Sequence, residues 1–178
     1  MRLTIIGIAI ACLTSTMAMA TDYKAGSIEI INPWSRATPK GASTAIGYMT
    51  IKNTGTIPDR LTGGSVDAAN QFELHLTVME NGISKMRELH DIEIKPGQTI
   101  EFKPGGSHAM FVNLKRPLNK GDRVTGTLVF ERAGKVQIEY TVEDVGAQRS
   151  SDQMENMQHY ACKKVASYRA SFLVTLSP

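Results

Sequence analysis

The chain has 178 residues, a formal net charge of +3 at pH 7 and only 6% aromatic residues. A weak positive charge without any block of Lys or Arg argues against a nucleic-acid-binding protein. The only cysteines are Cys12 and Cys162. Because Cys12 falls in a predicted leader, we do not expect the folded domain to contain an internal disulfide.

The first twenty residues have the pattern of a cleaved signal peptide. Arg2 gives a positive start, residues 3–13 are almost wholly apolar, and Ala18-Met19-Ala20 is a small-residue cleavage site. The apolar run is too short to span a bilayer. We therefore predict cleavage after Ala20, export, and no stable membrane insertion. Lipid attachment at Cys12 is the weaker alternative, because the residues before it match a lipoprotein recognition sequence poorly.

Residues 21–147 show short alternating segments separated by Gly, Pro and Asn turns, and none has a helical stripe of convincing length. The first segment is expected to stop at Pro33-Trp34, and the third to be broken by Gly63-Gly64. Seven to nine strands at this spacing favour an all-β, antiparallel β-sandwich with Greek-key connections. The expected segments are 27–32, 45–53, 60–66, the hairpin 72–89, 92–94, 99–102, 108–114, 123–131 and 136–142.

Asn81-Gly82 predicts a two-residue hairpin turn, because a type I′ turn needs positive φ at both central residues. In that register Thr77 faces Met86, and His75, Met79 and Met86 share one side of the hairpin. The same register puts two cations, Lys85 and Arg87, on the face of Leu74, Leu76 and Val78. That conflict favours either a slipped register or a position at the rim of the domain.

A second pair with the same spacing, His108 and Met110, would also project to one face of a strand. Imidazole and thioether groups without a neighbouring thiol suit a soft ion, and thioethers select Cu(I). Each residue also has an ordinary interpretation, since single histidines are commonly satisfied side chains and Met79 could fill a gap in the core. Spacing alone therefore leaves a metal site and a packed core as open alternatives.

Residues 148–178 differ from the rest of the chain. Methionine, aromatic and aliphatic residues recur there at three- and four-residue steps, which is typical of an amphipathic helix. A short helix or a disordered tail is the favoured interpretation. The alternative is a secondary metal site, with Cu(II) as a further candidate ion, formed by Met154, Met157, His159 and Cys162.

Several segments together resemble the periplasmic copper chaperones called PCuA(C), and the similarity covers residues 26–145. The spacing of His75, Met86 and His108-Ala109-Met110 resembles the signature of that family. The other similar segments are Pro33-Trp34-Ser35-Arg36-Ala37-Thr38-Pro39, Asn53-Thr54-Gly55-Thr56-Ile57-Pro58-Asp59-Arg60, Lys103-Pro104-Gly105-Gly106 and Leu114-Lys115-Arg116-Pro117.

The resemblance implies a periplasmic protein with a cupredoxin-like sandwich that binds one Cu(I) near its surface. It implies that the ligands are His75, Met86, His108 and Met110, with Met79 outside the ligand set as a residue of the surroundings. It further implies delivery of copper to acceptors such as the binuclear copper centre of cytochrome c oxidase, with thioredoxin-like Sco-type proteins as partners.

Two other functional classes compete with this interpretation. A blue-copper electron carrier needs two histidines and a cysteine around the ion, and Cys162 lies far from the predicted sandwich. A metal-free exported adhesion or scaffold sandwich would also fit the strands. A hydrolase is poorly supported, since Ser107 and His108 are strand neighbours that point to opposite faces. We therefore do not expect an enzyme.

Overall fold

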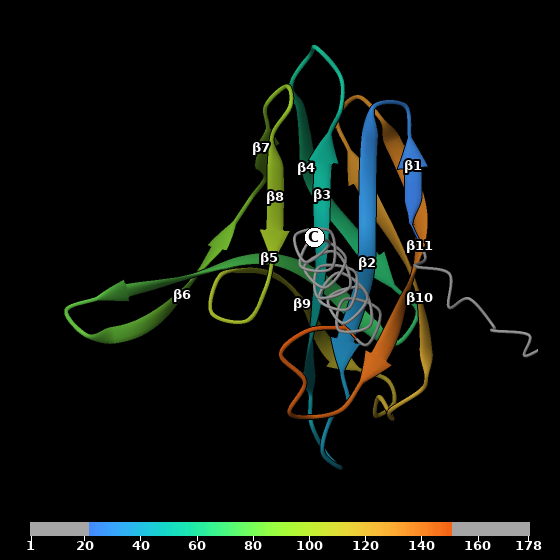
Figure 1. The fold of residues 1–178 in the computed structure, drawn as a ribbon. Coiled ribbons are helices and arrows are strands. Elements are labelled where there is room, and N and C mark those ends of the chain that lie inside the picture. Colours follow the sequence, from blue (N-terminus) through green and yellow to red (C-terminus); the bar gives the residue numbers. More distant parts are fainter. Residues whose placement is uncertain (1–21, 151–178) are drawn as a thin grey trace, which may run out of the picture.

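Alternating apolar and polar residues form eleven β-strands and no helix in residues 22–150, the part of the chain that this computed structural model describes (Figure 1). Within that range no helix has the length and apolar character that a membrane span requires. The predicted signal peptide and the predicted secondary site of Met154, Met157, His159 and Cys162 lie outside the described residues. The strands are β1 (Tyr23–Ala25), β2 (Ile28–Arg36), β3 (Thr44–Asn53), β4 (Asp59–Val66), β5 (Ala69–Glu80), β6 (Ile83–Leu89), β7 (Ile92–Ile94), β8 (Thr99–Phe102), β9 (Ser107–Leu114), β10 (Arg123–Phe130) and β11 (Gly134–Glu143).

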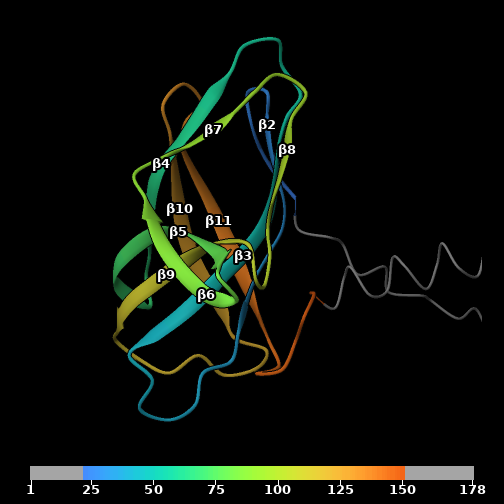
Figure 2. The same cartoon turned by 90° about the vertical axis from the view of Figure 1, so that its left-hand side faces the viewer.

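The strands join in the order β6-β5-β9-β8-β3-β2-β11-β10-β4-β7, and β1 pairs with β2. The sheet folds over on itself, and Figure 2 shows the resulting layers, with β2, β3 and β8 on one side and β4 and β10 on the other. The predicted all-β sandwich is therefore confirmed. Two of the pairings, β2 with β11 and β8 with β9, are parallel, so the sheet is mixed rather than purely antiparallel.

An aromatic cluster fills the centre of the core. Tyr140 and Phe111 are fully buried, and their rings meet edge to face with centroids 5.2 Å apart. Two glycines make room for these rings. A Cβ on Gly47 would lie 2.5 Å from Phe111 Cζ, and one on Gly126 would lie 2.9 Å from Tyr140 Cε2. The large side chains thus occupy space that any side chain at these two positions would block.

Two predicted strand interruptions are wrong. β2 does not stop at Pro33 but continues to Arg36 through an irregularity between Ile31 and Trp34, where Asn32 has a φ of 48°. A bulge tolerates proline because the missing N–H breaks no ladder hydrogen bond there. β4 likewise runs unbroken through its two glycines and pairs with β10, and the register shift between them leaves Thr62 of β4 as the extra residue. The glycines mark a bulge in this pair of strands instead of an end.

The β5–β6 hairpin has the predicted register. Asn81 and Gly82 form the turn with φ values of 51° and 77°, and Thr77 lies opposite Met86. Of the two alternatives, the slipped register is wrong and the position at the rim is confirmed, and Glu80 on the same face forms ion pairs with both Lys85 and Arg87. Every residue from Ile83 to Glu88 is exposed. The hairpin projects from the body of the domain (Figure 1), so its cations meet solvent and not the core.

Candidate metal site

The pairing of β5 with β9 sets two histidines side by side. His75 lies directly opposite His108 in the antiparallel register, and the centroids of their rings are 5.8 Å apart. Directly opposed residues share a sheet face. The two imidazoles therefore lie next to each other on one face, although a long stretch of sequence separates them.

The two predicted sulfur donors lie on the same face from the strands on either side. Met110 follows two residues after His108 on β9 and faces Glu73 on β5. Met86 on β6 faces Thr77, which makes it a diagonal neighbour of His75. The structure thus places the four residues that were predicted as ligands on one face of the sheet.

Each imidazole is held by a hydrogen bond at one nitrogen only. His75 Nε2 lies 2.8 Å from Glu73 Oε2, and His108 Nδ1 lies 3.0 Å from the carbonyl oxygen of Gly106. A carboxylate and a carbonyl oxygen only accept, so both of these ring nitrogens carry the proton and donate. The tautomers are thereby assigned from the partners. In each neutral ring the lone pair is left on the opposite nitrogen.

Those opposite nitrogens are buried without a partner. His75 Nδ1 and His108 Nε2 are two of four such side-chain atoms among residues 22–150. An unsatisfied buried polar atom costs roughly 1–3 kcal/mol, and such an atom in a native structure calls for a bound water, a bound ion or a functional role. Two of them on adjacent rings of one sheet face are suited to coordinate a single cation.

Burial keeps the His108 ring neutral. Its side chain belongs to a residue that is only 4% exposed, and the loss of water around it lowers its pKa below the ordinary value of 6.5. The hydrogen bond to Gly106 raises the pKa, and the nearby His75 lowers it further by repulsion, but burial is the largest effect. A neutral imidazole with a free lone pair is the form that binds metal.

The methionines become more exposed away from the histidines. Met110 is half-buried, Met86 is 59% exposed, and Met79 is 68% exposed on the projecting hairpin. The alternative that Met79 fills a gap in the core is therefore wrong. Met79 lies on the sheet face that carries His75 and His108, which we call the site face, because alternate residues of β5 point to one face. It lies further toward the hairpin turn than His75 does.

Glu73 is the residue that the sequence reasoning missed. The signal was present, because Glu73 precedes His75 by two residues and such residues of a strand point to one face. Carboxylates that accept the second N–H of a metal-binding histidine fix its ring and raise its basicity. The carbonyl of Gly106 does the same for His108, and a backbone atom of a turn gives no such signal in the sequence.

Within residues 22–150, no group of three or more His, Cys, Asp or Glu side chains is placed to hold a metal ion. The neighbours of the imidazole pair on the site face that carry soft donor atoms are the thioethers of Met86 and Met110. A cation at the two free nitrogens would thus complete its ligands with sulfur. That donor set fits a soft monovalent ion much better than a hard divalent one.

Comparison with known proteins places the chain in a family. A family model with the description "LpqE-like" matches residues 28–142. The chain belongs to the LpqE-like family. A protein of Leifsonia xyli subsp. xyli named "Putative lipoprotein Lxx21020" is 33% identical over 128 residues, which cover 71% of this chain and 76% of that protein.

Solved structures of PCuAC domains have a fold similar to that of this chain. The apo PCuAC domain of PmoF2 is 31% identical, with a TM-score of 0.63 over 73% of this chain and all of that domain. The copper-bound PCuAC domain of the same protein is 31% identical, with a TM-score of 0.61 over 70% of this chain and 98% of that domain. The predicted resemblance of this LpqE-like chain to PCuA(C) proteins is thereby confirmed.

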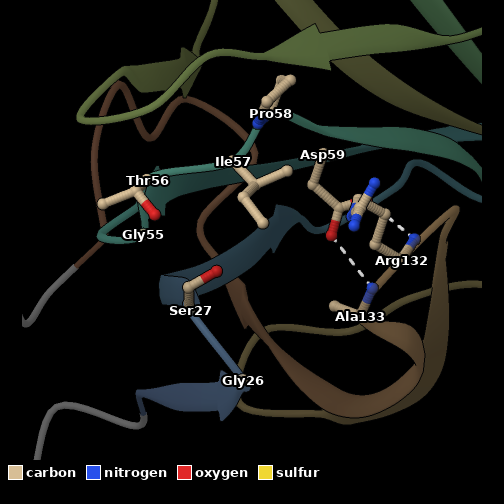
Figure 3. A pocket seen from close by; sticks show the side chains of 9 residues that line it. All are labelled: Gly26, Ser27, Gly55, Thr56, Ile57, Pro58, Asp59, Arg132 and Ala133. Atoms are coloured by element: carbon tan, nitrogen blue, oxygen red, sulfur yellow. Dashed lines mark hydrogen bonds between the residues drawn. The ribbon is translucent and has the colours of Figure 1, made fainter.

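A pocket of about 320 Å³ lies apart from the histidines, and none of its lining residues belongs to β5, β6 or β9. Figure 3 shows Asp59 in its wall, accepting hydrogen bonds from the backbone amides of Arg132 and Ala133, each 2.9 Å long. Asp59 also accepts one from the amide of Arg60. Its carboxylate is thus engaged in fastening the β10–β11 turn to β4, which is a structural role.

Proposed function

We propose that this LpqE-like protein is a copper chaperone that binds one Cu(I) through two imidazoles and two thioethers and passes it to acceptor proteins. The proposed ligands are His75, Met86, His108 and Met110. The observation that carries the proposal is the pair of buried, unpartnered nitrogens on adjacent rings, His75 Nδ1 and His108 Nε2. The copper-bound PCuAC domain of PmoF2 supports copper as the ion.

The donor set favours Cu(I) on chemical grounds. Thioethers select Cu(I), and imidazole suits copper in general. Four neutral donors leave the bound ion with a net charge of +1, which limits the cost of burying charge beside a sheet. Residues 22–150 contain no cysteine, so the described domain lacks the thiolate that a blue-copper centre needs. The alternative of an electron carrier is therefore disfavoured.

The exposure of the site favours transfer over storage or catalysis. Met86 is more than half exposed on a projecting hairpin, whereas His108 is almost fully buried. An incoming ligand can thus reach the ion from the Met86 side of the site. A thiolate acceptor binds Cu(I) more strongly than a thioether does, so copper would move toward the thiolate. We propose no enzymatic turnover, because ligand exchange alone accomplishes this task.

The family resemblance suggests the acceptors. We propose the copper-binding subunit of cytochrome c oxidase and Sco-type thioredoxin-like proteins, which meet this chaperone in the periplasm. Export through the predicted signal peptide with cleavage after Ala20 would deliver it there. The name of the Leifsonia relative makes lipid attachment at Cys12 the alternative. Intact-mass measurement of the exported protein distinguishes the two, because cleavage after Ala20 leaves an unmodified chain that begins at Thr21.

The decisive experiment is an anaerobic titration with Cu(I) against a competing chelator. We expect one tightly bound ion in the wild-type protein and weaker binding in Met86→Ala, since that change removes one thioether from an exposed strand. His108→Ala should weaken binding further, because it removes a pre-oriented nitrogen. His90→Ala is the matched control, since His90 is an exposed histidine beyond the end of β6 and should bind like the wild type.

Equal copper binding by all four proteins would contradict the proposal. The chain would then be an exported sandwich without a metal role at this face. Circular dichroism of each variant provides the folding control, and Met86 is suited to it because its exposed side chain contributes little to the core.

A further inference from the structure

The projecting end of the β5–β6 hairpin carries a second pair of soft donors. Met79 faces Ser84, and Met86 faces Thr77 in the neighbouring pair. The two methionines are therefore diagonal neighbours on one face, about 7–8 Å apart at the backbone. Each methionine has three rotatable bonds and a polarizable sulfur, so the two sulfurs can converge on one ion.

Charge is divided between the two faces of this hairpin end. Glu80, Lys85 and Arg87 form ion pairs on the opposite face. The site face at the same level presents uncharged side chains, which are Thr77, Ser84 and the two methionines. Glu88 lies on that face too, but further back, opposite His75. The two thioethers thus meet solvent without a charged side chain between them.

The exposure of both methionines has no packing explanation. Met79 is 68% exposed and Met86 is 59% exposed, so neither contributes much buried area. Apolar side chains that gather on an exposed surface commonly mark a functional contact. The nearby free nitrogens of His75 and His108 indicate a soft cation as the contact here. These two observations are independent, since one concerns exposure and the other concerns unsatisfied donors.

Near the hairpin turn, β5 has a neighbouring strand on one side only. The register of β5 with β9 ends at Leu76 opposite Ser107, so residues 78–80 of β5 pair only with β6. A two-stranded ribbon of this kind is only marginally stable in water. Its side chains can therefore rearrange around an ion more readily than those of the histidine pair, which are fixed by three strands.

We propose that Met79 and Met86 form a weak outer Cu(I) site. The ion would pass through it on the way into and out of the inner site, which consists of His75, Met86, His108 and Met110. This inference rests on the proposed function and extends it. The sulfur of Met86 is a ligand of the ion in both the inner and the outer site. This sulfur stays bound while the thioether of Met79 replaces His75, His108 and Met110 as partner, and the acceptor's ligand then replaces Met79. Only dative bonds form and break, and the copper stays Cu(I) throughout.

The first test is NMR of the full chain with labelled methionine methyl groups, using Ag(I) as a redox-inert substitute for Cu(I). The first equivalent should shift the histidine ring signals and the methyls of Met86 and Met110. The second equivalent should shift the Met79 methyl and shift the Met86 methyl a second time, with an affinity at least tenfold weaker, because the second ion draws Met86 away from the inner ion, which then keeps His75, His108 and Met110. In Met79→Leu the second event should vanish, while the first keeps an affinity within about twofold of the wild type.

The second test is the rate of Cu(I) transfer from the loaded protein to a strong chromophoric chelator. Met79→Leu should slow transfer at least threefold, because it removes one of the two sulfur ligands of the outer site. The substitution keeps the approximate size of the side chain. Ile83→Leu is the matched control, since Ile83 is 62% exposed on the opposite face of the same hairpin, and it should transfer at the wild-type rate.

The proposal requires both results. A Met79 methyl that stays unshifted through two equivalents, or wild-type transfer by Met79→Leu, would overturn it while leaving the inner site intact. Failure of the proposed function looks different, because the histidine ring signals would then stay unshifted at the first equivalent.

Discussion

The aromatic core and the site face each bury a titratable ring, but they differ in what surrounds that ring. Tyr140 is fully buried and His108 is almost so, and in both cases loss of water favours the neutral form, which raises the pKa of Tyr140 and lowers that of His108. The surroundings of Tyr140 are filled with close-packed side chains. His108 instead keeps one ring nitrogen without a partner, and its ring lies 5.8 Å from that of His75.

The comparison indicates that stability and ion binding are assigned to different parts of the domain. The core gains its free energy from complementary shapes, including the two glycines that admit Tyr140 and Phe111. On the site face, two buried nitrogens without partners lower the stability of the metal-free folded protein. A bound ion would remove that cost and stabilise the folded protein by mass action. Substitutions in the two regions should therefore affect different measurements.

The largest expected effect is on stability and comes from the core. Leu128 is fully buried in β10, so Leu128→Ala should lower the free energy of unfolding by about 2–5 kcal/mol, through lost burial and a new cavity. Denaturant unfolding measures this. Cu(I) affinity of the protein that remains folded should stay within about twofold of the wild type. A large loss of affinity would show that the two regions are coupled.

The next effect is on affinity and comes from the site face. Glu73→Ala removes the carboxylate that accepts the N–H of His75, and it should weaken Cu(I) binding about 10–100-fold, as loss of such partners commonly does. Glu88→Ala is the matched control, because Glu88 faces His75 from the other neighbouring strand and is exposed. Chelator competition with both variants makes the comparison. Equal losses in the two would indicate a general charge effect instead of ring positioning.

The smallest effect is on the pH dependence of stability without metal. The unfolded chain protonates His108 near its ordinary pKa of 6.5, whereas in the folded domain the lowered pKa keeps the ring neutral to lower pH. Between these two values the unfolded state binds more protons, so stability falls as pH falls, by at most about 1.4 kcal/mol per pH unit.

Denaturant unfolding at pH 7.5 and 5.5 measures this dependence. His108→Gln lacks the titrating ring, so its stability should fall less between these pH values than that of the wild type. An equal fall in both proteins would contradict the lowered pKa. A ring signal of His108 that titrates below 6.5 in the NMR spectrum of the wild type would provide the direct check.

Local features of the fold were predictable where a few neighbouring residues decide them. Asn81 and Gly82 prescribe the turn, so the pairing of Thr77 with Met86 followed from the sequence. Strand ends were less predictable. Pro33 is a common stop signal, but pairing on both sides of β2 outweighs it, and a bulge accommodates the ring.

By itself, the sequence determined the all-β character, the register of the hairpin and the alternation that puts His75, Met79 and Met86 on one side. It also determined the soft character of the donors, because side-chain chemistry does not depend on the fold. Only the tertiary structure decided that His75 faces His108, that Glu73 and Gly106 each occupy one nitrogen, and that Met79 stays in solvent. The reason is physical: a tight turn is specified by two adjacent residues, whereas the pairing of β5 with β9 is selected by the cooperative packing of the whole core.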